Sequence, residues 1–296
     1  MKLRLIAIIG FFTVTIMYSE SSFAQVQFGA FADCQYCNCE TAGSRFYRNS
    51  LGKLEVCIQQ FNQNKRIKFV VGLGDLIDRN LASYDRVNAI LDHSKHRVYN
   101  VAGNHDFGVE KNQLDQVPKK LHLQKTYYSF TKKNWMFIFL NGNEITVNSN
   151  DSEIVKQAET MLAKLKQENK PNTYEWNGGM SQEQINWMKQ QLQKAENKNL
   201  KVVLFCHYPL LPLEAHTLWN SEEVLTILEK YDNVKLWLNG HNHAGNYAFQ
   251  DGIYFVNLKG MVETANENAY SEVILSDNKI IIKGYGREPN RSLTIQ

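Results

Sequence analysis

The sequence predicts an α/β layered fold with mixed sheets, and three observations lead to this prediction. Short apolar runs with the length of buried strands recur along the chain, helical stretches lie between the first of them, and later runs follow one another mostly without helices. Hydrophobic residues make up 43% and charged residues 21% of the 296 residues, with 17 glycines and 5 prolines. This composition argues against a disordered chain, a collagen-like repeat and a protein with many membrane spans.

The predicted strands have the β-branched or aromatic content that is typical of buried strands. A first set, separated by helical stretches, covers residues 27–32, 68–73, 97–101, 202–206 and 234–238. A second set, mostly without helices between its members, covers residues 127–130, 135–140, 253–258, 271–275 and 279–282. Because both kinds of connection occur, the sheets should be mixed rather than purely parallel.

Helices are predicted from the spacing of apolar residues and from capping patterns. Helical spacing occurs over residues 46–61 and 82–92, and residues 151–169 form an amphipathic pattern in an insertion between strands. Two capping-box patterns predict the starts of further helices, namely Ser181 with Gln184 and Asn220 with Glu223.

Residues 1–24 have the features of an export signal. Lys2 and Arg4 give a positive start, residues 5–18 are mostly apolar, and small residues precede the expected cleavage site. As an alternative, this run could be a membrane anchor, but its 14 residues would rise only about 21 Å as a helix, short of the roughly 30 Å hydrocarbon core. We expect a mature chain that begins at Gln25, is exported to a periplasm or secreted, and is not stably inserted in the membrane.

The mature chain, residues 25–296, is interpreted as one domain because no repeat, low-complexity tract or linker interrupts it. The full chain has a formal net charge of +3, which is too slight and too scattered to indicate a nucleic-acid partner. Binding of anionic groups such as phosphate would therefore need a local site rather than the overall charge of the chain.

The five cysteines all lie in the mature chain, and an odd number in an exported protein leaves at least one unpaired or intermolecular. Cys34, Cys37 and Cys39 have the spacing of a zinc half-site, but no second pair of cysteines or histidines completes it nearby. We favour a loop disulfide, with Cys57 as a candidate partner, or reduced thiols. The sequence leaves open which of the five cysteines, Cys206 included, form a disulfide.

Polar clusters follow five of the predicted strands directly. They contain two carboxylates, two amides and four imidazoles: Asp33, Gln35, Asp75, Asn104, His105, His207, His241 and His243. Because ligands of α/β sheets bind at the carboxyl ends of the strands, these clusters should converge on one composite site. Carboxylate, amide and imidazole groups in this number are enough to hold two divalent metal ions.

The motifs D-x-Q, G-D-x-x-D, G-N-H-D, H-Y-P and G-H-N-H occur in this order within residues 27–245. They resemble the calcineurin-like metallophosphoesterase superfamily, and this resemblance implies the metallophosphoesterase four-layer α/β/β/α sandwich with mixed sheets. Additional segments resemble the manganese-dependent ADP-ribose/CDP-alcohol diphosphatase branch, namely residues 45–51, 177–184, 218–220, 260–264 and 283–287.

The resemblance implies two metal ions with a shared carboxylate. Asp33, Gln35, Asp75 and His243 would hold one ion. Asp75, Asn104, His207 and His241 would hold the other. Most of the superfamily has histidine where this chain has Gln35, and the harder amide oxygen favours Mn or Mg. We expect two divalent ions, Mn in the first place, with Mg, Fe or Zn as alternatives, sharing an activated hydroxide.

By the same resemblance, His105 would face the reacting phosphate as a general acid or a stabiliser of the transition state. Asp106 could orient His105 or cap the following turn, and Asp78 is interpreted as a hydrogen-bonding residue of its loop. The histidines without such neighbours are interpreted as surface or loop residues: His93, His96, His122 and His216.

The activity implied is hydrolysis of the diphosphate bond in small-molecule nucleotides such as ADP-ribose and CDP-alcohols. The alternative is a broad phosphomonoesterase or a cyclic-nucleotide phosphodiesterase that uses the same site. Arg45, Arg48 and Trp219 are candidate substrate contacts. The favoured alternatives are that the two arginines are solvated and that Trp219 packs before the capped helix rather than stacking on a base. The segment over residues 36–44 departs from the branch, so base selectivity does not follow from the resemblance.

Overall fold

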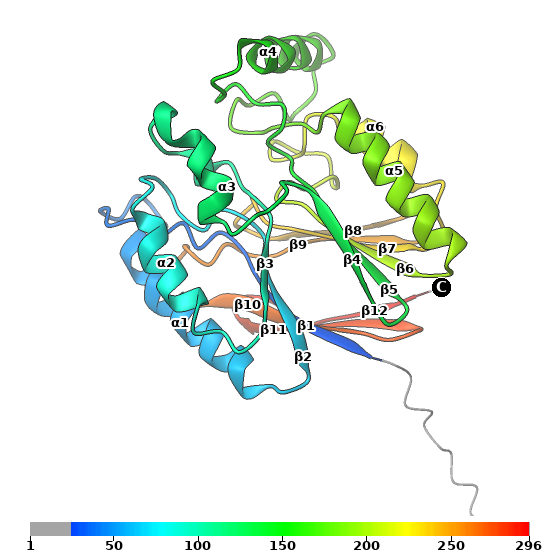
Figure 1. Ribbon diagram of the computed structural model, residues 1–296, viewed down its shortest axis with the longest axis horizontal. Helices are drawn as coiled ribbons and strands as arrows, with labels where there is room; N and C mark the ends of the chain where they lie inside the picture. Colours follow the sequence, from blue (N-terminus) through cyan, green and yellow to red (C-terminus); the bar gives the residue numbers. More distant parts are fainter. Residues whose placement is uncertain (1–24, 296) are drawn as a thin grey trace, which may run out of the picture.

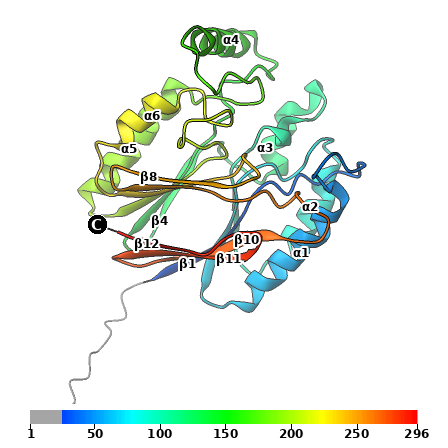
Figure 2. The same ribbon diagram turned by 180° about the vertical axis from the view of Figure 1, so that it is seen from behind.

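The computed structural model describes residues 25–295, so the predicted export signal over residues 1–24 lies outside the described residues. Two six-stranded sheets pack face to face, and helices cover the outer face of each sheet (Figures 1 and 2). The predicted four-layer α/β/β/α arrangement with mixed sheets is therefore confirmed. Among the described residues, no helix combines the length and the apolar character needed to span a bilayer.

The first sheet has the strand order β12-β11-β10-β1-β2-β3. Its strands are β1 (Val26–Phe31), β2 (Ile67–Gly72), β3 (Val98–Asn100), β10 (Ala269–Leu275), β11 (Lys279–Gly286) and β12 (Arg291–Thr294). β1, β2 and β3 are parallel to one another, whereas β10 pairs with β1 in the antiparallel direction and begins the antiparallel half of the sheet.

The second sheet has the strand order β4-β5-β6-β7-β9-β8. Its strands are β4 (Tyr128–Lys132), β5 (Trp135–Phe139), β6 (Lys201–Phe205), β7 (Val234–Asn239), β8 (Asn246–Gln250) and β9 (Ile253–Asn257). The four central strands are parallel, and β4 and β8 add antiparallel edges. The carboxyl ends of the parallel strands of both sheets therefore provide the loops that can meet at one site.

The helices follow the order of the chain around these sheets. They are α1 (Tyr47–Gln63), α2 (Ser83–Leu91), α3 (Val117–Lys120), α4 (Ser152–Gln167), α5 (Gln182–Asn197) and α6 (Ser221–Leu228). α1 and α2 lie against the first sheet, α5 and α6 against the second, and α4 stands apart from both at the top of Figure 1. Two short 3-10 helices, η1 (His105–Phe107) and η2 (Lys111–Gln116), follow β3.

The core between the sheets is built from aromatic side chains of both. The ring of Phe28 in β1 lies 5.0 Å from that of Phe69 in β2 and 5.6 Å from that of Phe205 in β6. Alternate residues of each strand point into this layer because side chains along a strand alternate between the two faces. The opposite faces of the strands bury apolar residues under the helices, which gives two further apolar layers.

All ten predicted strands and the predicted helices are present, with shifts of a few residues at their ends. β8 and β12 are missing from the prediction because both are short edge strands with largely exposed residues, so neither shows the apolar run of a buried strand. Ser181 caps α5 as expected, since its side chain accepts a hydrogen bond from the main-chain N of Gln184. Asn220 does not cap α6, because its side-chain oxygen accepts instead from the main-chain N of Met180.

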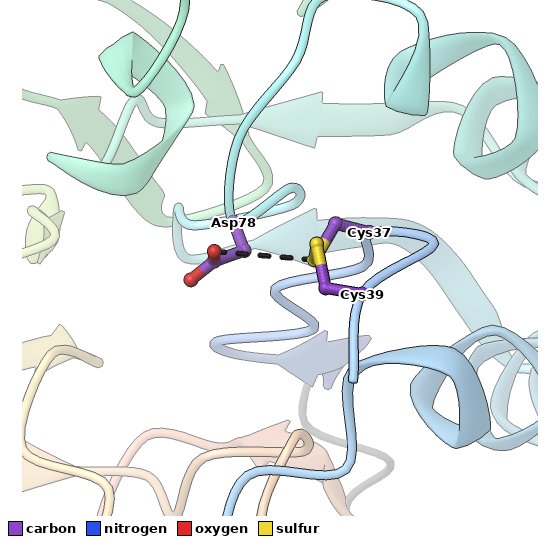
Figure 3. A group of neighbouring side chains, drawn as sticks. All are labelled: Cys37, Cys39 and Asp78. Carbon is purple, nitrogen blue, oxygen red and sulfur yellow. Dashed lines mark hydrogen bonds between the residues drawn. A yellow bond between two sulfur atoms is a disulfide. The ribbon is translucent and has the colours of Figure 1, made fainter. Parts of the chain in front are cut away.

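The structure places the disulfide between Cys37 and Cys39, beside the carboxylate of Asp78 (Figure 3). The suggestion that Cys57 could take part is therefore wrong. Cys57 lies on the buried face of α1, in the apolar layer between that helix and the first sheet. Cys34 and Cys206 are likewise free and buried.

Candidate metal centre

The predicted ligands lie on the loops that follow the parallel strands, and several of these loops have an unusual backbone. Asp33, Gln35 and Asp75 have positive φ angles of 51°, 44° and 54°, and His241 has φ 74°. Non-glycine residues rarely adopt this conformation, and such strain is concentrated at functional sites. Gly74 has φ +93°, and a Cβ there would lie 2.6 Å from Nδ1 of His207. The loop therefore needs glycine for its conformation and for the close approach of the imidazole.

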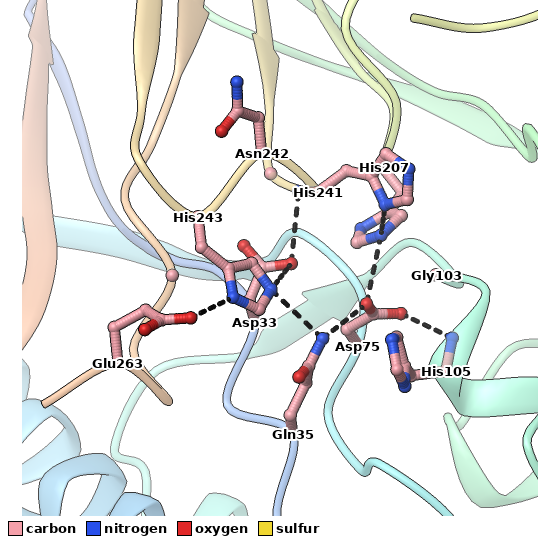
Figure 4. A network of polar contacts seen from close by, with 12 residues as sticks. Asp33, Gln35, Asp75, Gly103, His105, His207, His241, Asn242, His243 and Glu263 are labelled. Atoms are coloured by element: carbon pink, nitrogen blue, oxygen red, sulfur yellow. Dashed lines mark hydrogen bonds and ion pairs between the residues drawn. The ribbon is translucent and has the colours of Figure 1, made fainter. Parts of the chain in front are cut away.

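The side chains of these loops converge around Asp75 (Figure 4). Its Oδ2 atom lies 3.3 Å from Nε2 of His207 and accepts a hydrogen bond of 3.0 Å from Nε2 of Gln35. On the side of Gln35, the Nε2 atom of His243 lies 3.8 Å from Oδ1 of Asp33. On the other side, the rings of His207 and His241 meet at 3.1 Å between nitrogen atoms. A carboxylate between two such groups has the position required of a ligand shared by two cations.

Each of the three candidate ligand histidines has one ring nitrogen held by an oxygen acceptor. Nδ1 of His207 contacts the carbonyl of Leu73 at 2.7 Å, and Nδ1 of His243 contacts Oε1 of Glu263 at 2.7 Å. Because these oxygens only accept, the nitrogen facing them carries the hydrogen. The other ring nitrogen, Nε2 in both residues, faces the centre and is the one able to bind a cation.

In His241 the roles of the two ring nitrogens are exchanged, because its Nε2 atom, rather than its Nδ1 atom, faces an oxygen acceptor, which belongs to Asn177. The Nδ2 atom of Asn177 donates to the carbonyl of Ala215 at 2.7 Å, so its Oδ1 atom is left to face Nε2 of His241 at 2.9 Å. Nε2 of His241 therefore carries the hydrogen, and Nδ1 points towards His207 and Asp75. Fixed ring orientations of this kind are typical of metal-binding histidines.

Three buried oxygen atoms of the candidate ligands have no hydrogen-bond partner. They are Oδ2 of Asp33, Oε1 of Gln35 and Oδ1 of Asn104. Buried polar atoms are nearly always paired, so unpaired oxygens on residues that also surround the inward-facing imidazole nitrogens require another partner. Hard divalent cations prefer such oxygen ligands, and the residues present therefore fit the two-cation centre that the motifs imply.

The charged side chains at the centre strongly shift one another's pKa values. Burial alone would raise the pKa of the Asp75 carboxyl, but the imidazoles of His207 and His105 outweigh it and hold that pKa well below its usual range. Burial disfavours the charged form of His207, but Asp75 outweighs this effect and raises the pKa of His207 to about 9. A cation bound at Nε2 must therefore displace a proton, so cation affinity should decrease as the pH falls.

His105 lies at the start of η1 with its side chain 27% exposed, and its ring lines the cavity above the centre. Its Nδ1 atom lies 3.0 Å from Oδ1 of Asp78, and its main-chain N donates to Oδ1 of Asp75 at 2.8 Å. Burial lowers the pKa of His105, but Asp75 and Asp78 together outweigh burial and raise it above the ordinary value. The ring is therefore poised to carry a proton at neutral pH.

The suggestion that Asp106 orients His105 is wrong. The buried carboxylate of Asp106 instead accepts hydrogen bonds of 2.9 Å from the main-chain N atoms of Asp75, Leu76 and Gly103. It ties the loop after β2 to the loop after β3, and Asp78 contacts His105 in its place. Asp78 does act within its own loop as expected, through an ion pair with Arg79, but its contact with His105 gives it a further role.

A cavity of about 460 Å³ lies over the centre. Its walls are formed by Gln35, Arg45, Asp75, Asn104, His105, Trp176, His216, His241 and His243. A neighbouring cavity of about 760 Å³ shares Asn104 and Trp176 with it and is lined largely by polar residues. Together the two hollows offer room for a substrate with groups on both sides of a phosphate.

Of the three candidate substrate contacts, only Arg45 lines the cavity over the centre. Arg48 lies elsewhere on the surface, where it pairs with Glu40 at 2.8 Å and contacts Asn38. The interpretation of Trp219 as a packing residue is confirmed and the base-stacking alternative is wrong. This side chain is buried in an apolar cluster under α4, and its Nε1 donates to the carbonyl of Tyr174.

Several residues at the site were not predicted. His216 lines the cavity although it is interpreted above as a surface or loop residue, and Trp176 stands beside it with ring centroids 4.9 Å apart. Asn177 and Glu263 orient ligand histidines from distant loops. Both lie in segments that carry the resemblance to the diphosphatase branch, but no local pattern marks their contacts. His93, His96 and His122 do not line this cavity.

Comparisons with known proteins agree with this geometry. A family model described as calcineurin-like phosphoesterase matches residues 26–245. A manganese-dependent ADP-ribose/CDP-alcohol diphosphatase from Homo sapiens is 29% identical over 92% of this chain and 94% of its own length. One from Arabidopsis thaliana is 28% identical over 88% of this chain and 94% of its own length. The crystal structure of a dimetal phosphatase from Danio rerio is 25% identical and superposes with a TM-score of 0.82, covering 92% of this chain and 99% of that one.

Proposed function

The chain belongs to the calcineurin-like phosphoesterase family, a family of hydrolases, and from this premise we propose that it cleaves the diphosphate bond of nucleoside diphosphate compounds. ADP-ribose and CDP-alcohols are the proposed substrates, since relatives about as long as this chain bear these compounds in their names. The single observation that best supports the choice is the pair of neighbouring cavities, one over the centre and one beside it, which share Asn104 and Trp176 in their walls. A diphosphate ester has a bulky group on each side of its phosphates, and each cavity could receive one.

In this proposal Asp33, Gln35, Asp75 and His243 hold one cation. Asp75, Asn104, His207 and His241 hold the other. The cations would supply positive charge that polarises the phosphoryl group and lowers the pKa of water. Manganese is the proposed metal, because the amide oxygens of Gln35 and Asn104 are hard ligands and because the relatives are manganese-dependent by name.

His105 donates a proton to the oxygen that leaves the phosphate. Its ring reaches the cavity and its pKa is raised above the ordinary value, burial being outweighed by Asp75 and Asp78. The raised pKa favours the protonated form, which a general acid requires. Asp78 holds Nδ1 of the ring, so that Nε2 is the atom that delivers the proton.

Arg45 and Trp176 position the substrate. The guanidinium of Arg45 lines the cavity and can neutralise a phosphate oxygen that the cations do not reach. The ring of Trp176 is 37% exposed and stacks on Tyr174 at a centroid distance of 4.8 Å. Stacking of a base on an exposed aromatic ring contributes about 1–3 kcal/mol, which would favour nucleotides over simple phosphate esters.

We also propose that residues 1–24 are an export signal that is cleaved before Gln25. A protein carried out of the cytoplasm would meet nucleotides released outside the cell or in a periplasm, and a scavenging role fits that location. Mass spectrometry of the protein isolated from its host tests the proposed cleavage. A mature chain that begins at Gln25 would support export, and an uncleaved Met1 would contradict it.

The proposed activity is tested by product analysis with residues 25–296 and Mn. The substrates are ADP-ribose, CDP-choline, ADP, cyclic AMP and p-nitrophenyl phosphate, each incubated also with the Asp75→Asn variant as a control. Release of AMP and CMP from the first two compounds supports a diphosphatase. Turnover confined to cyclic AMP or p-nitrophenyl phosphate would overturn that assignment and favour the phosphodiesterase or phosphomonoesterase alternative.

A further inference from the structure

The carboxylate of Glu263 contacts His243, as Figure 4 shows, and also faces Arg45, a side chain of the proposed site with a different task. Its Oε1 atom is 2.7 Å from Nδ1 of His243, a candidate cation ligand. The same oxygen lies 4.0 Å from Nε of Arg45, which lines the cavity over the centre. One carboxylate oxygen thus faces both a cation ligand and a candidate phosphate contact.

The main chain around Glu263 is held firmly in place. Glu263 and Arg45 form an isolated antiparallel β-bridge, which fixes their spacing. The Nζ atom of the buried Lys53 donates to the carbonyl of Glu263 at 3.0 Å, and Arg287 donates to the same carbonyl at 3.3 Å. These cations contact main-chain oxygen atoms, so they do not occupy the carboxylate of Glu263. The carboxylate faces His243 and Arg45, and the side chain of Ser44 also forms a hydrogen bond with it.

We propose that Glu263 is a positioning residue that links cation binding at His243 to phosphate recognition by Arg45. The inference rests on the metal centre of the proposed function but not on the choice of a diphosphate substrate. By accepting from Nδ1, the carboxylate keeps Nε2 of His243 directed at the cation and makes it a better donor of electrons. By facing Nε of Arg45, it orients the guanidinium so that the remaining N–H groups can reach a phosphate oxygen.

Two substitutions separate these tasks. In Glu263→Gln the side-chain oxygen can still accept from Nδ1 of His243, but the negative charge facing Arg45 is lost. In Glu263→Ala both contacts are lost. A third variant, Arg45→Met, removes the guanidinium alone. Glu267→Gln is the matched control, because Glu267 is an exposed acid of the same segment.

The first measurement is calorimetric titration of each protein with Mn, which does not depend on turnover. Loss of an acceptor that orients a metal-binding histidine typically weakens metal affinity by about 10–100-fold. We expect a loss of this size at one of two Mn sites in Glu263→Ala, a clearly smaller loss in Glu263→Gln, and none in Arg45→Met or Glu267→Gln. Binding of Mn by Glu263→Ala with the affinity of the unsubstituted protein would overturn the proposal.

The second measurement uses bis(p-nitrophenyl) phosphate at saturating Mn. We expect KM to rise in Glu263→Gln and in Arg45→Met with little change in kcat, and the double variant to have the KM of Arg45→Met. Independent, multiplying effects on KM would show that the two residues do not act together and would overturn the link. Thermal unfolding of every variant verifies folding, and Glu263→Gln carries the test if Glu263→Ala does not fold.

The two proposals fail in different ways. If ADP-ribose and CDP-choline are not cleaved, the diphosphatase assignment is overturned, while the Mn titrations and the phosphodiester kinetics still decide the role of Glu263. If those titrations and kinetics show no effect of Glu263, the inference is overturned even when both nucleotides are cleaved.

Discussion

The Nδ1 atom of His105 lies 3.0 Å from Oδ1 of Asp78, whereas the carboxylate of the adjacent Asp106 is occupied by main-chain N–H groups. The residue that follows His105 in sequence therefore shapes the loops, and a residue 27 positions earlier holds the ring. Because the Asp78 side chain is only 2% exposed, its charge acts on His105 with little screening by water. The proton-donating role of His105 should depend on this contact.

Asp78→Asn should shift the pH dependence of kcat. Asp75 and Asp78 raise the pKa of His105 against the effect of burial, so removing one carboxylate lowers that pKa. If protonated His105 is the acid, the alkaline limb of kcat moves to lower pH, and kcat at pH 8 falls more than kcat at pH 6. The pH profile is measured at saturating Mn with bis(p-nitrophenyl) phosphate.

Two further variants serve as controls for Asp78→Asn. His105→Ala removes the acid itself and should lower kcat by about 10²–10⁴-fold, with Mn content unchanged. Arg79→Gln removes the exposed cation that pairs with the other oxygen of Asp78, so it should leave the alkaline limb nearly in place. An unchanged profile in Asp78→Asn, or loss of Mn in His105→Ala, would contradict the assigned roles.

Removal of the cations should abolish activity and lower the melting temperature. One buried oxygen in each of Asp33, Gln35 and Asn104 has no protein partner, so cations that bind these oxygens would stabilise the folded state. At a free Mn concentration of 100 times the dissociation constant, this stabilisation is about 2.7 kcal/mol per site. Thermal unfolding and activity are measured after chelation and again after Mn is restored.

Asp75→Asn is the matched variant for this experiment, since it removes the charge that both cations would share. Its melting temperature should respond far less to Mn than that of the unsubstituted protein. The Mn effect should also weaken between pH 8 and pH 6, because protons compete at His207, whose pKa Asp75 raises to about 9 against burial. A variant that retains the full Mn response would place the shared ligand elsewhere.

The strand-end ligands could be predicted from the sequence because each belongs to a short motif directly after an apolar strand. Asp75 and Asn104, for example, are placed by β2 and β3 alone. Contacts between loops are different, since their geometry depends on how separate segments fold against each other. Asp78 reaches His105 across two loops, and Trp176 and His216 meet from segments forty residues apart. The capped helix after Trp219 favoured packing, but the sequence could not exclude base stacking, because no local pattern distinguishes a buried tryptophan from an exposed one.

The thiols should react in three distinct stages. Cys34, Cys57 and Cys206 are free and fully buried, and burial raises the pKa of Cys34 and of Cys206 to about 12. These thiols stay protonated at pH 8, and the thiolate is the reactive form. A thiol reagent should therefore modify no cysteine of the native protein, three after denaturation, and all five after denaturation with a reductant.

The thiol counts also test the disulfide. A count of five without reductant would contradict the bond between Cys37 and Cys39, and a count of one would require a second disulfide among the buried thiols. Peptide mapping of the unreduced protein identifies the linked pair. A peptide that joins Cys37 to Cys57 would revive the pairing that the structure excludes.

Trp176 and Trp219 should respond differently to replacement by alanine. Trp176 lines the cavity with its ring 37% exposed, so its loss removes stacking worth about 1–3 kcal/mol, or roughly a 5- to 150-fold increase in KM for ADP-ribose. KM for bis(p-nitrophenyl) phosphate should change less, because that substrate carries no base. Trp219 is 3% exposed in an apolar cluster, so Trp219→Ala should lower the free energy of unfolding by about 3–5 kcal/mol without a selective effect on nucleotides. Kinetics with both substrates and denaturant unfolding of both variants make the comparison. Equal KM changes for the two substrates in Trp176→Ala would show that the ring does not contact the base.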